Sequence, residues 1–483
     1  MNPDSRTASA RRIDASGIGL AAGGKPVEQS LYEIRQTIHP RAVHGWFAAW
    51  RWTLVWATQL VFYGLAWLPW NDRQAVLFDL AQRKFYIFGL VFWPQDFIYL
   101  TALLVISALC LFLFTAVAGR LWCGYACPQT VYTEIFLWIE GRIEGDRNRR
   151  MKLDKGPLTA RKFGLKAAKH LAWGAIALWT GFTFVGYFTP IRELLVEAGA
   201  LSLGPWETFW TFFYGFATYG NAGWMREQVC KHMCPYARFQ SAMFDRDTLV
   251  IAYDAERGEP RGSRSKGADP GALGLGSCVD CGICVQVCPT GIDIRNGLQY
   301  ECIGCAACID GCDQVMEKVG YPKGLIRYST TRAVEEHLAP RAMLARILRP
   351  RVLIYTAILW TVIAAAVASL WLRVPLKVDV IRDRAAISRE VPGGFVENVY
   401  RLQIMNTTEK DRRFRAHVEG LSPAFIEGAN GFALEATSTS MVTVKVRSKL
   451  GELPAGTHKM RFVVEAEDDA HVVVSEKSVF IVR

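Results

Sequence analysis

Five stretches of the chain are apolar over the length that a helix needs to cross a bilayer, about 20 residues. They cover residues 46–70, 97–119, 171–191, 208–225 and 352–372. Their one charged residue is Arg51, which lies close enough to the end of the first stretch to reach the membrane surface. A single such stretch could be a buried core helix, but five of them predict an α-helical membrane domain of about five spans.

The C-terminal segment, residues 374–483, follows a different pattern. Stretches such as LKVDVIRD, VYRLQIMN, MVTVKVRS and MRFVVEAE alternate apolar and polar residues, with turn-forming residues between them. About seven such strands predict an antiparallel β-sandwich of immunoglobulin-like architecture. The segment lacks cysteine and tryptophan, so the disulfide and buried tryptophan of antibody domains are missing. It contains no catalytic constellation, and docking of a partner is its expected role.

Charge in the loops predicts the orientation of the spans, because short cytoplasmic loops are enriched in lysine and arginine. Residues 142–169 hold ten basic residues against three acidic ones, whereas residues 192–207 hold one arginine against three glutamates. The N-terminus is therefore expected in the cytoplasm, and five crossings of a bacterial inner membrane place the C-terminus in the periplasm. The first 45 residues are polar, and we expect a loosely ordered tail without a removable signal peptide.

Eight of the thirteen cysteines form two copies of the spacing C-x2-C-x2-C-x3-C, in CVDCGICVQVCP and CIGCAACIDGC. This run wraps a cubane iron–sulfur cluster, because three thiolates of one run hold three irons and the fourth reaches the neighbouring cluster. Gly282 and Gly304 leave room where the backbone curls around the metal. By the alternating rule one [4Fe–4S] cluster takes Cys278, Cys281, Cys284 and Cys312, and the other takes Cys302, Cys305, Cys308 and Cys288.

Zinc sites and a disulfide knot are the alternatives to two clusters. Zinc has no preference for two matched runs of this spacing, and twelve of the thirteen cysteines fall in the cytoplasm or at its membrane boundary, where disulfides are rare. The thirteenth, Cys110, lies within the second span. Asp313 follows the second run where Pro289 follows the first, which affects the cluster surroundings and not the ligands.

Four further thiols form two C-x3-C-P motifs at the ends of membrane helices. The second span runs into Arg120 and CGYACP, with Cys123 and Cys127, and the fourth runs into Arg226 and CKHMCP, with Cys230 and Cys234. The two motifs are 107 residues apart. This offset indicates a weak internal repeat whose halves are related by an axis along the membrane normal, which would bring the two thiol pairs towards each other.

The spacing of these four thiols leaves several roles open. In a helix, residues i and i+4 have Cβ atoms about 5–6 Å apart, which strains a disulfide, and thiolates select Cu(I), zinc or iron–sulfur clusters. His232 and Met233 would also suit copper. Buried structural thiols, helix ends marked by Pro128 and Pro235, and a disulfide between the motifs are the alternatives.

Several other classes of function are disfavoured. The formal charge of +11 would suit nucleic acid, but the basic residues flank apolar stretches and do not form one patch. Of eight histidines only His170 is near a span, which argues against a membrane haem. No G-x-G-x-x-G opens a helix after a strand, so a dinucleotide site is not expected. Electrons are therefore expected from an external cytoplasmic donor.

These features predict five consecutive parts. They are a cytoplasmic tail (1–45), a four-span membrane domain with both C-x3-C-P motifs (46–240), a cytoplasmic ferredoxin domain with two [4Fe–4S] clusters (241–340), a fifth membrane helix (341–373) and a periplasmic immunoglobulin-like sandwich (374–483).

The paired C-x3-C-P motifs, the run CVDCGICVQVCPTGIDIRNGLQYECIGCAACIDGC, a further span and a C-terminal sandwich together resemble the FixG/CcoG family over nearly the whole chain. These are membrane polyferredoxins that serve cbb3-type cytochrome c oxidase, and the resemblance implies a cupric reductase that supplies Cu(I) to the copper centre of that oxidase. It implies oxidase subunits or copper-delivery proteins as partners. It also implies a catalytic, copper-binding role for Cys123, Cys127, Cys230 and Cys234.

Two other functions fit the same motifs. One is a quinol-linked electron conduit, like the membrane ferredoxins of nitrate and nitrous oxide respiration. The other is an assembly scaffold that holds copper and whose clusters are structural. The sequence leaves open which donor supplies the electrons, on which side copper is loaded, and whether the chain forms a homodimer.

Overall fold

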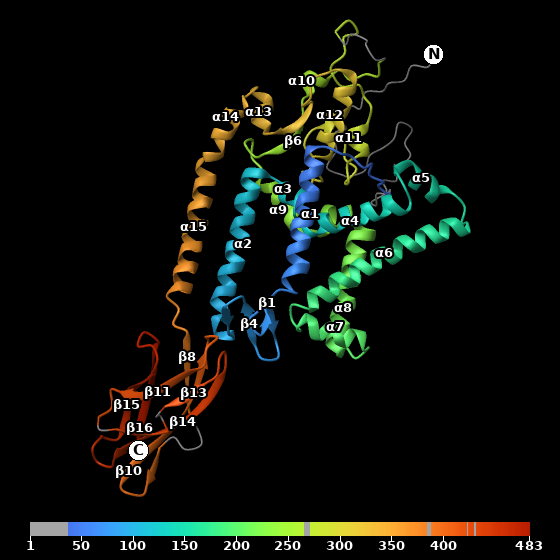
Figure 1. The fold of residues 1–483 in the computed structure, drawn as a ribbon. Coiled ribbons are helices and arrows are strands. Elements are labelled where there is room, and N and C mark those ends of the chain that lie inside the picture. The colour runs from blue at the N-terminus through green and yellow to red at the C-terminus, as the bar shows by residue number, and fades with distance from the viewer. Residues whose placement is uncertain (1–36, 265–270, 384–387, 423, 429–430) are drawn as a thin grey trace, which may run out of the picture. The chain divides into compact units, whose positions relative to one another are not determined.

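The computed structural model describes residues 37–264, 271–383, 388–422, 424–428 and 431–483. Most of the predicted N-terminal tail, residues 1–45, therefore lies outside the described residues. The chain divides into Met1–His39 and Pro40–Arg483, and the described helices and strands all belong to the second unit. Figure 1 shows their order along the chain.

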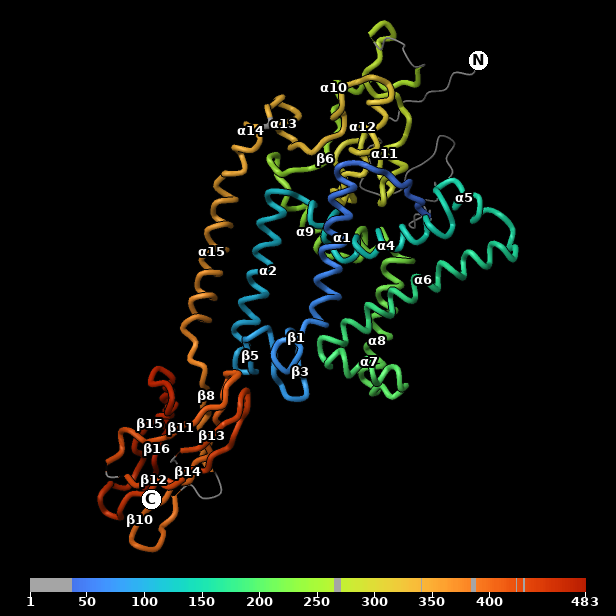
Figure 2. The backbone as a smooth tube through the Cα atoms, viewed as in Figure 1, coloured from blue at the N-terminus to red at the C-terminus, as the bar shows by residue number. Residues whose placement is uncertain are grey.

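Two helices are long and apolar enough to cross a membrane within the described part of the chain. They are α2 (Phe97–Ala118), which follows a short 3-10 turn from Pro94, and α15 (Pro350–Trp371). Each has 22 residues, which at 1.5 Å per residue spans about 33 Å, close to the thickness of a bilayer core. They pack side by side with opposite directions, as Figure 2 shows.

Both ends of this helix pair are fixed by arginines. Arg349, just before α15, donates to the carbonyl of Ala116 at 2.5 Å, and Arg373, just after α15, pairs with Asp96 at 2.8 Å. Tyr99 also donates to the carbonyl of Ser369 at 3.2 Å. Because the start of each helix lies beside the end of the other, the segments before and after α15 lie at opposite ends of the pair.

The other three apolar stretches form helices with different bounds from those predicted. Helix α1 (Trp46–Leu65) stops five residues early, α6 (Ala160–Val185) begins in the basic loop, and α8 (Pro205–Thr218) continues as a π-helix over Tyr219–Met225. Five crossings therefore stay a prediction. Helices α6 and α8 pack closely at Gly181, which has no side chain. A Cβ atom at this position would collide with the carbonyl of Thr211.

The segment between α1 and α2 contains strands that the sequence pattern did not predict. β1 (Pro69–Trp70) pairs with β2 (Arg73–Gln74), and β3 (Val76–Asp79), β4 (Lys84–Ile87) and β5 (Leu90–Phe92) form a second antiparallel sheet. Residues of this sheet pack with Met405 of the C-terminal domain, and Asn71 donates to Glu409 at 2.5 Å. The short sheet thus ties the helices to the sandwich.

The C-terminal domain is the predicted antiparallel β-sandwich. One sheet has the order β12-β14-β10-β8, with β9 beside β10, and the other has the order β13-β11-β15-β16. Alternate residues of the long strands face inward, and Tyr400, Phe414, Phe462 and Phe480 are fully buried between the sheets. The strands are β8 (Leu376–Arg382), β9 (Arg389–Val391), β10 (Phe395–Asn406), β11 (Arg412–Glu419), β12 (Phe425–Glu427), β13 (Phe432–Leu434), β14 (Thr439–Lys449), β15 (Gly456–Ala466) and β16 (Val473–Val482).

The cysteine-rich segment folds between two antiparallel strands, β6 (Val250–Tyr253) and β7 (Ile326–Ser329). Each cysteine run leads into a helix, α11 (Ile283–Gln286) for the first run and α12 (Ala307–Val319) for the second. The remaining helices are α3 (Leu121–Tyr125), α4 (Pro128–Ile143), α5 (Arg147–Lys155), α7 (Ile191–Gly199), a π-helix (Val229–Met233), α9 (Pro235–Met243), α10 (Ala255–Gly258), α13 (Thr331–Glu335) and α14 (Pro340–Ala345).

Helix α1 receives its N-terminal cap from the cysteine-rich segment. Asp310 of α12 accepts the N–H groups of Phe47 at 3.3 Å and Ala48 at 2.7 Å, which no residue of α1 itself satisfies. We expect Asp310→Ala to destabilise the protein by about 1 kcal/mol, the usual effect of losing a capping oxygen. Thermal unfolding in detergent tests this. Glu317→Ala, exposed on the same helix, is the control, and an equal melting temperature for both variants would contradict the capping role.

Candidate metal centre

Two cavities lie side by side in the cysteine-rich segment, and cysteines line both. Most of their remaining walls are apolar, with Met316 and Leu325 at the first cavity and Ile251 and Ile303 at the second, and Arg295 also lines the first. The first is lined by Cys278, Cys281, Cys284 and Cys312, and the second by Cys302, Cys305, Cys308 and Cys288, with Cys284 also at its edge. The fourth cysteine of each run thus reaches the cavity of the other run, as the alternating rule requires.

The loop of each run uses two residues with left-handed backbone. Asp280 (φ +50°) and Gly282 (φ +65°) occupy the first loop, and Gly304 (φ +69°) and Ala306 (φ +58°) occupy the same places in the second. The sequence predicted that the backbone turns tightly at Gly282 and Gly304. Asp280 and Ala306 were missed, because only the structure reveals that non-glycine residues are held in this conformation by the surrounding fold.

The buried thiols fit an iron–sulfur cluster chemically. Burial raises the pKa of Cys284 and Cys305 to about 11 and that of Cys302 and Cys312 to about 12. Thiols in such surroundings stay protonated near neutral pH unless a metal compensates the charge. Their deprotonation is therefore coupled to the binding of iron.

The two C-x3-C-P motifs adopt matching backbone conformations, which supports the internal repeat. Gly119 (φ +55°, ψ −120°) and Arg226 (φ +40°, ψ −111°) lie four residues before the first thiol of their motifs. The second thiols, Cys127 and Cys234, are extended residues that precede Pro128 and Pro235 at the starts of α4 and α9. Neither motif is one continuous α-helix, so the spacing of an ideal helix does not apply to these thiols.

The four thiols of these motifs, which we call the thiol quartet, gather in one place. Burial, together with the neighbouring quartet thiols, raises the pKa of Cys123 to about 11 and that of Cys230 to about 12. All thirteen cysteines are free. Among the described residues no three His, Cys, Asp or Glu side chains converge tightly enough to hold one metal ion. Copper binding at the quartet stays a prediction.

The thiol quartet lies directly against the second cysteine-lined cavity. Cys123 and Cys230 pack into the same apolar cluster as Cys305 and Cys308. A Cβ atom at Gly124 would lie only 2.7 Å from Cys305 Cα. The first motif and the second cysteine run therefore touch backbone to backbone.

Two buried arginines join α1 and the segment after α2 to the second cysteine run. Arg51 of α1 donates to the carbonyl of Cys305 at 2.6 Å. Arg120 donates to the carbonyls of Tyr300 and Cys302, and also to that of Ala237 in α9. The sequence pattern gave Arg51 and Arg120 no role in this site, because their partners are distant along the chain.

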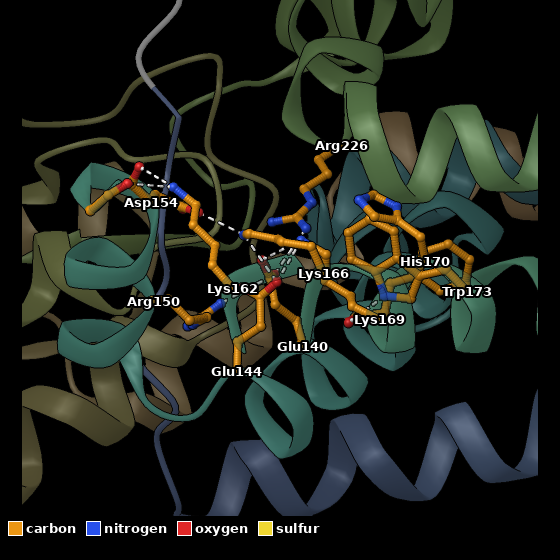
Figure 3. Close-up of polar contacts among 12 residues, drawn as sticks. Glu140, Glu144, Arg150, Asp154, Lys162, Lys166, Lys169, His170, Trp173 and Arg226 are labelled. Atoms are coloured by element: carbon orange, nitrogen blue, oxygen red, sulfur yellow. Dashed lines mark hydrogen bonds and ion pairs between the residues drawn. The ribbon is translucent and has the colours of Figure 1, made fainter. Parts of the chain in front are cut away.

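A network of buried charges fixes the segment before Cys230, as Figure 3 shows. Glu140 of α4 pairs with Arg226 at 2.9 Å and with Arg150 at 3.2 Å, and Lys169 lies 3.7 Å away. Burial alone would raise the pKa of Glu140, but these cations hold it below the ordinary value. The network gives several basic residues of the loop 142–169 a structural role, beyond their bearing on topology.

A cleft of about 890 Å³ opens beside the quartet and the second cavity. Cys230 and Cys305 both line it, together with Glu134 of α4 and the aromatic residues Trp52 and Trp138. Glu134 forms no hydrogen bond or ion pair with the described residues, and Arg51 is the charged group that acts on it. The cleft therefore gives small solutes a route to Cys230 of the quartet.

Family models match the iron–sulfur segments and the C-terminal domain of this chain. A model for a 4Fe–4S dicluster domain matches residues 225–331, a 4Fe–4S binding domain matches residues 100–145, and the immunoglobulin-like fold at the C-terminus of FixG matches residues 366–483. Protein RdxA of Cereibacter sphaeroides is 40% identical, over 89% of this chain and 93% of its own length. The nitrogen fixation protein FixG of Rhizobium meliloti is 39% identical, over 86% and 85%.

Two further matches are partial. The methylamine utilization ferredoxin-type protein MauN of Methylorubrum extorquens is 25% identical over 38% of this chain and 52% of its own. A crystal structure of a FixG-related protein from Vibrio parahaemolyticus covers 22% of this chain and 95% of its own, at 22% identity and a TM-score of 0.20.

Proposed function

The chain belongs to the FixG/RdxA family of iron–sulfur electron-transfer proteins, and we propose that it reduces Cu(II) to Cu(I) at its thiol quartet. In this proposal the Cu(I) serves the assembly of a cbb3-type cytochrome c oxidase. An external cytoplasmic donor supplies the electrons, and oxidase subunits or copper-delivery proteins receive the product. The observation that carries the proposal is the direct contact between the quartet and the second cysteine-lined cavity.

The lining of the two cavities supports the assignment of the cluster ligands. Cys278, Cys281, Cys284 and Cys312 would hold the first cluster, and Cys302, Cys305, Cys308 and Cys288 the second. Cys284 borders both cavities, and its place in the first set follows from the spacing rule. The clusters supply one-electron transfer when they are bound.

The thiol quartet suits copper as the electron acceptor because its donor atoms are soft. Each Cu(II) takes one electron and becomes Cu(I), which thiolates favour over Cu(II). Quartet thiols would therefore stabilise the product of the reaction more than the substrate. The cleft beside Cys230 offers copper a path to these thiols, and Glu134 and Glu227 on its wall carry oxygen ligands that suit Cu(II).

The paired helices α2 and α15 support an inner-membrane location with domains on both sides. Their ends are held by Arg349 near the cysteine-rich segment and by Arg373 near the sandwich. A bilayer around the pair would separate these two parts. We place the iron–sulfur part in the cytoplasm, where basic loops are retained, and the sandwich in the periplasm, where it would dock a partner.

Anaerobic mixing of the reduced protein with Cu(II) tests the proposal. Cu(I), measured with a Cu(I)-specific chelator, should form as the cluster absorption returns to that of the oxidised protein. The double variant Cys123→Ser/Cys127→Ser should retain its iron and lose the reaction, because the thiols that receive copper next to the second cluster are gone. Equal rates for the variant and the unchanged protein would refute the role of the quartet.

The two alternative functions give different outcomes in the same experiment. Oxidation of the reduced protein by quinone analogues, with no response to Cu(II), would identify a quinol-linked conduit. Clusters that cannot be reduced at cellular potentials would identify a scaffold in which they are structural.

A further inference from the structure

The two cysteine loops differ in charge although they share one backbone shape. The first loop carries Asp280 where the second carries Gly304. Asp313 follows the last ligand assigned to the first cluster, whereas the uncharged Pro289 follows the last ligand assigned to the second. The first cavity therefore has two carboxylates at places where the second has none.

Among the described residues, the one cation that lines the first cavity is shared between carboxylates. Arg295 pairs with Asp280 at 2.5 Å and with Asp293 at 2.7 Å. Asp313 accepts the N–H of Gly324 at 2.9 Å, a neutral partner that leaves its charge in place. Three carboxylates therefore surround this cavity. Among the described residues Arg295 is the cation that pairs with any of them, and Arg261 acts on Asp293 only from a distance.

The second cavity has the opposite surroundings. Arg51 and Arg120 are each only 6% exposed, and their guanidinium groups donate to backbone carbonyls of the second run and its neighbours. Neither forms an ion pair with the described residues, and a carbonyl does not neutralise a cation. Glu134 and the buried Asp310 act on Arg51 only at a distance, since neither forms a hydrogen bond or ion pair with its guanidinium.

Arg120 also lies between the second cavity and the thiol quartet. Its guanidinium bridges Tyr300 and Cys302 on one side and Ala237, just after the second motif, on the other. Its charge acts on Cys302 of the second run and also on Cys123, Cys230 and Cys234 of the quartet. A positive charge at this position favours an electron on either neighbouring centre.

We propose that Arg51 and Arg120 hold the reduction potential of the second cluster above that of the first, so that electrons settle beside the thiol quartet. The inference rests on the cluster ligands assigned under the proposed function. Reduction adds a negative charge, which a buried cation stabilises strongly in surroundings of low dielectric constant and nearby carboxylates disfavour. Charge and hydrogen bonding near a cluster are among the factors that set its potential.

A redox titration of the full-length protein, followed by EPR and without copper, tests this inference. The unchanged protein should show two steps. Arg51→Gln and Arg120→Gln should each lower the upper step by at least the equivalent of a tenfold change in the reduction equilibrium, about 59 mV for one electron, and leave the lower step in place. Asp313→Asn should raise the lower step.

Two matched variants separate charge from packing. Arg51→Lys keeps the positive charge, so its upper step should lie nearer to that of the unchanged protein than that of Arg51→Gln does. Arg142→Gln removes an exposed arginine that stacks on Trp138, and it should leave both steps unchanged. If Arg120→Gln fails to fold, the comparison of Arg51→Gln with Arg51→Lys and the Asp313→Asn shift decide the question.

An unchanged upper step in Arg51→Gln, or a shift confined to the lower step, would overturn the inference. The result does not depend on copper chemistry. Shifted potentials in a protein that cannot reduce Cu(II) would support this inference and refute the proposed function. Copper reduction with unshifted potentials would support the proposed function and refute this inference.

Discussion

Cys305→Ser will abolish Cu(II) reduction and lower the iron content from about eight to about four atoms per chain, as expected for the loss of one cubane. Cys305 is an assigned ligand of the second cluster, and three features of the structure involve it. It lines the second cavity, its carbonyl accepts a hydrogen bond from Arg51, and its backbone touches Gly124. Its loss should therefore remove the centre that faces the thiol quartet. Iron analysis and the Cu(I) chelator assay measure the two effects.

Cys110→Ser is the matched control for this variant. Cys110 is an exposed thiol on α2, eight residues before the helix ends at Ala118 and outside both cysteine motifs and both cysteine runs. Its replacement should change neither the iron content nor the reaction. Copper reduction by Cys305→Ser at the unchanged rate would show that electrons reach copper without the second cluster.

Gly124→Ala will uncouple the quartet from the second cluster while both clusters remain assembled. A methyl group at this position would lie 2.7 Å from Cys305 Cα and 2.8 Å from the carbonyl carbon of Gly304, so the two backbones must move apart. We expect a loss of stability of about 1–3 kcal/mol from overpacking. We also expect copper reduction to fall by about tenfold or more, since displacements near 1 Å can have effects of this size.

Gly141→Ala on α4 is the control for the alanine itself. A Cβ atom at Gly141 meets nothing within 4 Å, so this variant should be as stable as the unchanged protein or slightly more stable. The informative comparison is the rate of copper reduction at equal iron content. Equal rates for Gly124→Ala and Gly141→Ala would mean that close contact at Gly124 is not needed for electron transfer.

The parts that the sequence predicted well are those whose signal is local. The spacing of the eight cluster cysteines, the apolar runs of α2 and α15, and the alternating strands of the sandwich are all readable within short windows. Cys288 and Cys312 each line the cavity of the other run, which is the placement that the alternating rule predicts, and their role as cluster ligands stays a prediction.

The parts that the sequence did not predict depend on contacts between distant segments. The sequence predicted that Arg51 reaches the membrane surface, yet it donates to the carbonyl of Cys305, 254 residues further along the chain. The sequence pattern assigned no role to Asp310, yet it caps α1 from 262 residues along the chain. The strands β3 to β5 have only three or four residues each, too short for an alternating pattern to stand out.

The basic loop 142–169 was interpreted through its charge alone. The structure pairs Arg150 and Lys169 with Glu140, and Lys166 and Lys169 with Glu144, in a buried network. Charge counting treats a buried pair and an exposed lysine alike. Charge counting therefore could not predict that α4, α5 and α6 pack around Arg226.

An anaerobic titration of the fully reduced protein with Cu(II) tests the central claim most directly, because it counts electrons on both sides. Two clusters per chain should each deliver one electron, so two Cu(I) should form per chain as both clusters become oxidised. Clusters that stay reduced in excess Cu(II) would contradict the account.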